Sequence, residues 1–141
     1  MAHKWNILIV EDNKADVFVI QEALKNAHIN AAVCIIDDGN LATEFIDAID
    51  RGKEMLCPDI MLLDLNLPKK SGNDVLKHLR NSIRCKGTLV VIVSSSDAPP
   101  DRNSVLGLSV SGWFKKSSRY AEYMKLGPLV KDLLEAKTGS L

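Results

Sequence analysis

The stretch of sequence that indicates the fold spans residues 60–68 and reads IMLLDLNLP. Its first four residues are apolar at successive positions, which is typical of a strand buried on both faces, as in a parallel sheet. Asp64 follows directly, and a carboxylate at the end of such a strand is costly unless it has a partner or a task. Residues 60–63 therefore predict a central parallel strand, and Asp64 is a candidate functional residue at its end.

Four more short apolar runs accompany this strand. They occupy residues 7–10, 33–36, 89–93 and 113–114, and stretches with helical spacing of apolar residues lie between them. Strands that alternate with helices form right-handed crossovers and a parallel sheet with helices on both faces. We therefore expect an α/β doubly wound fold with five parallel strands. The alternation takes up residues 1–141, so we expect one domain and no output domain.

Two helices in the second half of the chain have a less regular pattern. Pro99 and Pro100 predict a loop, and residues around Val105 and Leu106 predict a short helix after it. The last helix is expected to run from about Arg119 into the 130s. Gly127 and Pro128 fall inside this last helix. Because proline lacks an amide proton and clashes with the preceding turn, we expect a kink or break there.

The three cysteines do not follow any metal-binding spacing. Cys34 lies in an apolar run, so we expect it to be a small core residue in a reducing compartment. Cys57 and Cys85 have more polar neighbours and are expected to be exposed thiols. No metal-binding or redox role is expected for these residues.

The composition argues against several classes of protein. The chain has 18 Lys and Arg and 18 Asp and Glu, so its formal net charge is zero. A nucleic-acid binder would show a basic excess, and no apolar run approaches the ~20 residues that a membrane span needs. Residues 1–5 contain no apolar signal core. We therefore expect a cytoplasmic protein that binds neither nucleic acid nor membranes.

Polar groups with related chemistry follow the predicted strands. Ligands of open parallel sheets bind at the carboxyl ends of the strands, so the residues just past each strand belong to one surface. This surface contains Glu11, Asp12, Asp64, Asn66, Ser94, Lys115 and Lys116. Clustered carboxylates favour a hard cation such as Mg²⁺, and a carboxylate can attack a phosphoryl group to form an aspartyl-phosphate. A hydroxyl and an amine would hold the phosphoryl oxygens, so the surface predicts a Mg²⁺-dependent phosphoryl site.

The motifs on this surface resemble those of the receiver domain of bacterial two-component response regulators. They read ILIVED at residues 7–12, LLDLNLP at 62–68 and VS at 93–94, followed by Trp113 and Lys116. The resemblance covers nearly the whole chain and implies a flavodoxin-like receiver fold with strand order 2-1-3-4-5. In finer detail the chain is similar to the small single-domain regulators that are often paired with bacterial phytochrome histidine kinases.

The resemblance implies how the acidic residues work. Asp64 would be the phosphoacceptor and would take a phosphoryl group from the phosphohistidine of a sensor histidine kinase. Asp12 would bind Mg²⁺ directly, and Glu11 would act mainly through a metal-bound water. Asn66 would supply its backbone carbonyl to the metal. Mg²⁺ is therefore the cofactor that the resemblance implies.

The resemblance also implies how phosphorylation is sensed. Ser94 would hydrogen-bond a phosphoryl oxygen and Lys116 would pair with it, while Trp113 stands where the family has its switch aromatic residue. Lys116 is preferred to Lys115 because the family's lysine falls three residues after that aromatic residue. Ser117 stands where most members of the family have proline after a cis peptide bond, so the loop is expected to differ.

The implied function is a phosphorylation-controlled switch in two-component signal transduction. We expect slow self-dephosphorylation and no turnover of an external substrate. Without an output domain, the signal would leave through an unknown downstream protein or through a homodimer. The expected dimer face comprises the fourth helix, the fifth strand and the fifth helix, whose aromatic surface would be Trp113, Phe114, Tyr120 and Tyr123.

Three other functions agree less well with these residues than a phosphorylation-controlled switch does. An aspartyl-phosphate hydrolase would carry a second acid where Asn66 stands and would place the pair after the first strand. A flavin carrier would need a hydroxyl-rich phosphate loop where Glu11 and Asp12 stand. The main alternative is a degenerate receiver that binds partners without phosphorylation, because Ser94 replaces the more frequent threonine and Trp113 replaces the usual Tyr or Phe.

Overall fold

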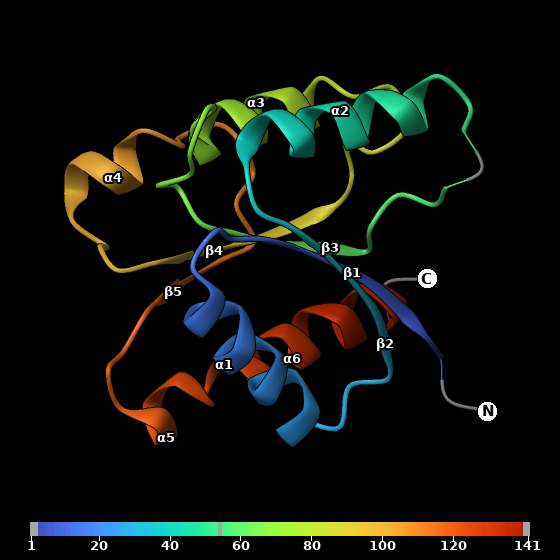
Figure 1. Ribbon diagram of the computed structural model, residues 1–141. Coiled ribbons are helices and arrows are strands. Elements are labelled where there is room, and N and C mark those ends of the chain that lie inside the picture. Colours follow the sequence, from blue (N-terminus) through green and yellow to red (C-terminus); the bar gives the residue numbers. More distant parts are fainter. Residues whose placement is uncertain (1–2, 54, 140–141) are drawn as a thin grey trace.

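The computed structural model describes residues 3–53 and 55–139 (Figure 1). Five parallel strands form one sheet: β1 (Trp5–Val10), β2 (Ala31–Ile36), β3 (Ile60–Leu63), β4 (Leu89–Ser94) and β5 (Gly112–Lys115). Their order across the sheet is β2-β1-β3-β4-β5. The predicted fold class and strand order are thus confirmed.

Helices cover both faces of this sheet. In the described residues they are α1 (Lys14–Asn26), α2 (Gly39–Asp50), α3 (Gly72–Arg80), α4 (Pro99–Asn103), α5 (Tyr120–Tyr123) and α6 (Leu126–Gly139). Figure 1 shows α2 and α3 on one face of the sheet and α1 and α6 on the other. All helices within the described residues are too short or too polar to cross a membrane.

Side-chain caps determine where three of the helices begin. Asn13, Asp38 and Ser71 each accept a hydrogen bond from the backbone N–H three residues further on, at 3.0, 2.7 and 3.3 Å. Such caps satisfy donors that the first turn of a helix leaves unpaired. Asn13 and Asp38 stand within three residues of the ends of β1 and β2, so these caps define the loops along the carboxyl edge of the sheet.

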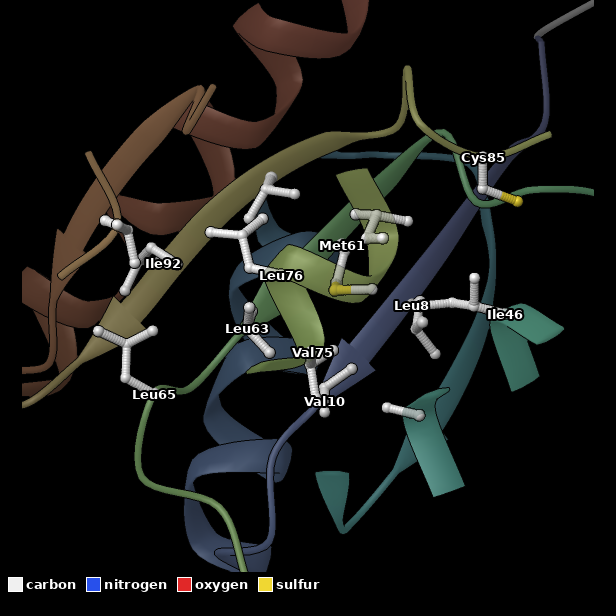
Figure 2. Close-up of a cluster of buried hydrophobic side chains, with 14 of the residues drawn as sticks. Leu8, Val10, Ile46, Met61, Leu63, Leu65, Val75, Leu76, Cys85 and Ile92 are labelled. Carbon is white, nitrogen blue, oxygen red and sulfur yellow. The ribbon is translucent and has the colours of Figure 1, made fainter. Parts of the chain in front are cut away.

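Alternate residues of the strands form a core beneath α2 and α3 (Figure 2). Leu8 and Val10 of β1, Met61 and Leu63 of β3 and Leu76 of α3 are each at most 1% exposed. Burying an aliphatic side chain of this size contributes about 1.5–3 kcal/mol relative to leaving it in water. The core therefore holds the ends of β1 and β3 firmly in place.

A second core fills the opposite face of the sheet. The intervening residues of β1 and β3 pack there against α1, α5 and α6. At Gly127, α6 packs tightly on α1, and an added Cβ would overlap the carbonyl oxygen of Ala23. Together the two cores bury every residue of β3, as the sequence of residues 60–63 predicts.

The C-terminal helix differs from the prediction in detail. The chain forms two helices, α5 and α6, and the break falls at Met124 and Lys125 rather than at Gly127 and Pro128. Pro128 is the third residue of α6, where amide groups have no acceptor within the helix, so proline removes no hydrogen bond there. A break was correctly expected, but the proline lies in the first turn of the new helix.

The helix predicted around Val105 and Leu106 is wrong. The helix in this region is α4, and Val105 and Leu106 lie in the turns that follow it. Pro99 and Pro100 occupy its first turn, where the fixed φ of proline suits a helix and its missing N–H removes no hydrogen bond. The two prolines therefore start a helix instead of extending the loop.

The environments of the cysteines were also predicted wrongly. Cys34 is exposed because β2 is an edge strand whose central residues are exposed. Cys57 and Cys85 are not free thiols: they form a disulfide with a Cα–Cα distance of 5.3 Å, and Cys85 is 1% exposed. An apolar run identifies a strand, but it does not show whether the strand lies at an uncovered edge.

Candidate functional site

Three carboxylates meet at the carboxyl ends of β1 and β3. Glu11 and Asp12 follow β1, Asp64 follows β3, and one oxygen of each lies within 4.8 Å of the others. The two strands are neighbours, and Val10 lies opposite Leu63, so the residues after them emerge side by side. The structure thus brings together the acids that the sequence pattern placed on one surface.

The loop after β3 orients the Asp64 carboxylate. Its Oδ1 accepts a hydrogen bond from the Asn66 N–H at 3.1 Å, and the Asp64 N–H donates to the carbonyl of Val10 at 3.1 Å. Gly72 packs directly on this loop, and an added Cβ there would overlap the carbonyl oxygen of Asp64. Asp64 is therefore buried and held by backbone groups of its neighbours, while the Asn66 side chain is exposed.

Lys116 supplies the positive charge at this site. Its Nζ lies 2.7 Å from Glu11 Oε1, 2.9 Å from Asp16 Oδ2 and 3.4 Å from Asp64 Oδ2. The Lys116 N–H donates to the Ser94 carbonyl at 2.7 Å and thereby aligns the loop after β5 with the end of β4.

The neighbouring Lys115 points elsewhere. It is exposed, and its Nζ lies 3.8 Å from Asp97. The peptide bond between Lys116 and Ser117 is trans, like the other described peptide bonds. The structure thus places Lys116, and not Lys115, beside the carboxylates.

Burial strongly affects the ionisation of Glu11. Burial raises the pKa of Glu11 to about 7, and the charge of Asp64 acts in the same direction, although the ammonium group of Lys116 opposes both. Burial by itself lowers the pKa of Lys116, but the contacts with Glu11 and Asp16 outweigh it and raise that pKa. Lys116 therefore stays charged, and when Glu11 is ionised the carboxylates around Lys116 carry more negative charge than one ammonium group neutralises.

The residues of this cluster fit a hard divalent cation. Within the described residues, Glu11 Oε1 is a buried oxygen that accepts no aligned hydrogen bond, although Lys116 Nζ forms an ion pair with it at 2.7 Å. Asp12 is exposed and offers a carboxylate that reaches solvent. An all-oxygen donor set with open positions for water suits Mg²⁺. A cation here would also offset the mutual repulsion of the acids.

Ser94, at the end of β4, and Trp113, in β5, both contact the loop between β4 and α4. Ser94 is buried, and its Oγ accepts a hydrogen bond from the Ser96 N–H at 3.2 Å. The Trp113 indole Nε1 donates to the Ser96 carbonyl at 3.1 Å, and the Arg102 guanidinium lies 4.9 Å from the centre of the indole ring. Both candidate switch residues therefore contact the same short loop segment.

Two residues of the site were missed by the sequence analysis. Asp16 of α1 contacts Lys116, and Tyr123 of α5 donates its hydroxyl to Asp16 Oδ1 at 3.0 Å. Tyr123 is 3% exposed, so the expectation that it contributes aromatic surface is wrong. Asp16 belongs to the motif that resembles the phytochrome-associated subgroup, but an acid in the first turn of a helix is usually explained by the helix dipole, so no role at the site was assigned to it.

Comparisons with known proteins cover both the sheet and the site. The pattern of the response regulator receiver domain matches residues 7–126. Response regulator Rcp1 from Synechocystis is 34% identical over 120 residues, which are 85% of this chain and 82% of Rcp1. The matched residues 7–126 include the three carboxylates and Lys116.

Solved structures give the same result. The Mn²⁺-bound form of Rcp1 superposes with a TM-score of 0.81 at 32% identity, covering 93% of this chain and 95% of that one. The phosphorylated cyanobacterial phytochrome response regulator RcpA superposes with a TM-score of 0.82 at 30% identity, covering 96% of each chain. Both similarities extend over nearly the full length of the described fold.

Proposed function

The chain belongs to the family of response regulator receiver domains, and from this premise we propose that Asp64 accepts a phosphoryl group from a sensor histidine kinase. The position of Asp64 is the main observation that supports this proposal. It is buried at the end of the central strand β3, with two further acids on one side and the ammonium group of Lys116 3.4 Å away. The degenerate receiver is not favoured, because the acids and the lysine all lie together.

The chemistry follows from the residues around Asp64. A carboxylate oxygen of Asp64 forms a bond to phosphorus while the phosphorus–nitrogen bond of the donor phosphohistidine breaks and the imidazole leaves. Lys116 and the Ser94 hydroxyl stabilise the transferred oxygens. Mg²⁺, held by Asp12, Asp64 and the carbonyl of Asn66 with Glu11 acting through water, would neutralise the negative charge of donor and acceptor.

The switch is proposed to act through the loop between β4 and α4. A phosphoryl group on Asp64 would draw the Ser94 hydroxyl away from the Ser96 N–H. Ser96 also accepts the Trp113 indole through its carbonyl, so a movement of Ser96 changes the hydrogen bond that holds the indole. A local change of charge would thus bias a loop with two arrangements, which is the general basis of phosphorylation switches.

Several finer features belong to the same proposal. We infer that residues 1–141 work as a single cytoplasmic receiver domain that releases its phosphoryl group slowly and turns over no external substrate. The similarity to the phytochrome response regulator RcpA supports a phytochrome-type histidine kinase as the donor. The signal would leave through a downstream protein or a homodimer formed by α4, β5 and α5, where Tyr120 is 53% exposed.

Phosphorylation of the purified protein tests this proposal directly. The protein is incubated with Mg²⁺ and acetyl phosphate, and its intact mass is recorded beside that of Asp64→Asn. We expect one phosphoryl adduct on the wild type, no adduct on Asp64→Asn, and loss of the adduct when Mg²⁺ is chelated. Asp132→Asn removes an exposed acid on α6 and is the matched control, which should be phosphorylated normally. A wild-type protein without an adduct, or an adduct retained by Asp64→Asn, would refute the proposed site.

A further inference from the structure

Lys116 has a contact that the proposed phosphoryl transfer does not use. Its Nζ lies 2.9 Å from Asp16 Oδ2 on α1, closer than its 3.4 Å distance to Asp64 Oδ2. Both contacts are largely shielded from water, because the side chains of Lys116, Asp16 and Asp64 are 14%, 22% and 7% exposed. In this structure, therefore, Asp16 holds the ammonium group more closely than the phosphoacceptor does.

Asp16 is itself held by Tyr123. The Tyr123 hydroxyl donates to Asp16 Oδ1 at 3.0 Å, so the two oxygens of Asp16 contact different partners. The Tyr123 ring is buried against Phe114, with ring centres 5.5 Å apart. Burial, followed by the charge of Asp16, raises the pKa of Tyr123, so the phenol keeps its proton and remains a donor. The Asp16 carboxylate is thus fixed in the orientation in which it contacts Lys116.

The number of donors on Lys116 sets up a competition. An ammonium group has three donors, and three carboxylates lie around Nζ: Glu11, Asp16 and Asp64. A phosphoryl group on Asp64 carries about 1.5–2 negative charges in place of the single charge of the carboxylate, and it presents three acceptor oxygens. Lys116 must then turn towards Asp64. Glu11 and Asp64 belong to the acids proposed to bind the metal, so the competing contact outside that group is the one with Asp16.

We infer that Asp16 is a positioning residue, held by Tyr123, that draws Lys116 away from Asp64 in the unphosphorylated protein and so weakens the phosphorylated state. This inference rests on the proposed function of Asp64. The release of Lys116 from Asp16 links the phosphorylation site to α1 and α5. The link is separate from the loop that contains Ser94 and Ser96.

Binding of beryllofluoride at saturating Mg²⁺ provides the test. Bound beryllofluoride is measured directly by fluorine NMR for the wild type, Asp16→Asn and Tyr123→Phe, and each titration is repeated at twice the Mg²⁺ concentration. Asp16→Asn keeps the size of the side chain but removes the charge that competes for Lys116 and repels the anion. We expect it to bind beryllofluoride about three- to tenfold more tightly than the wild type.

Tyr123→Phe should act in the opposite direction and only through Asp16. Without the phenol, the Asp16 charge is less satisfied and holds Lys116 more strongly, so beryllofluoride should bind about two- to threefold more weakly. In the Asp16→Asn background the same substitution should have no effect, as in a double-mutant cycle between residues in contact. Glu22→Gln removes an acid further along α1 and should match the wild type.

The outcomes separate this inference from the proposed function. If the wild type binds beryllofluoride but Asp16→Asn binds it equally or more weakly, the role of Asp16 is refuted while Asp64 remains the phosphoacceptor. If Tyr123→Phe has the same effect with and without Asp16, Tyr123 does not act through Asp16, and that part of the inference is overturned. If the wild type fails to bind and is also not phosphorylated, the proposed function itself fails.

Discussion

The buried Glu11 should make the stability of the protein depend on pH in a defined window. Its pKa is raised from 4.5 to about 7, chiefly by burial. The folded protein therefore binds this proton more tightly than the unfolded chain does. The stability that protonated Glu11 confers is fully present below pH 4.5 and is lost as the pH rises towards 7.

The size of the effect follows from the shift. Each pKa unit corresponds to 1.36 kcal/mol, so this shift corresponds to roughly 3 kcal/mol lost across the window. Glu11→Gln resembles the protonated acid and does not titrate. The free energy of unfolding of Glu11→Gln minus that of the wild type should therefore increase by about 3 kcal/mol between pH 4.5 and pH 7.5.

Urea unfolding in the presence of a chelator measures this difference. Both proteins are unfolded at half-unit pH steps, and tryptophan fluorescence reports the folded fraction. Subtracting the two profiles of unfolding free energy against pH removes the contributions of all titrating groups that the two proteins share. If the difference in free energy of unfolding between Glu11→Gln and the wild type stays constant from pH 4.5 to pH 7.5, burial does not destabilise the ionised carboxylate of Glu11, and the argument is refuted. Saturating Mg²⁺ should restore part of the wild-type stability at pH 7, because a bound cation favours the charged form of Glu11.

Two further substitutions and the reduction of a disulfide test other parts of the structure. Gly72→Ala should lower the free energy of unfolding by about 1–3 kcal/mol and slow phosphorylation by acetyl phosphate, because the added Cβ would overlap the Asp64 backbone. Gly87→Ala is the control: its Cβ would meet nothing within 4 Å, so its stability and phosphorylation should match the wild type. Arg80→Met should destabilise the protein by about 2–4 kcal/mol in urea, because the guanidinium donates to four backbone carbonyls at 2.7–2.9 Å; unchanged stability would show that these bonds contribute nothing. Reduction of the Cys57–Cys85 disulfide, which links residues 28 apart, should lower the free energy of unfolding by about 3–4 kcal/mol. Equal stability of the oxidised and reduced protein would show that the disulfide does not stabilise the fold.

Much of the fold was predictable because its signals are local. The apolar run at residues 60–63 and the four similar runs indicated strands from residue type and spacing alone. The right-handed crossover rule then left few ways to arrange them. Glu11, Asp12 and Asp64 were found because the carboxyl ends of parallel strands share an edge, which needs no knowledge of side-chain positions.

The errors arose where a local pattern had two structural outcomes. Pro99 and Pro100 suited either a loop or the first turn of a helix, and the structure has a helix. The apolar run around Cys34 suited either a covered or an uncovered strand, and its position at the sheet edge leaves Cys34 exposed. In both cases the neighbours in space, rather than the neighbours in sequence, decided the outcome.

Strand identity, the acidic edge and the phosphoacceptor candidate follow from sequence, because hydrophobic periodicity and residue chemistry are properties of short segments. The contacts of Asp16 do not, since Lys116 is 100 residues away and Tyr123 is 107 residues away. The pairing of Cys57 with Cys85 likewise depends on two loops that become neighbours when β3 and β4 join the sheet. Hydrogen bonds, ion pairs and disulfides form over a few ångströms, so only the packed structure decides which distant residues share them.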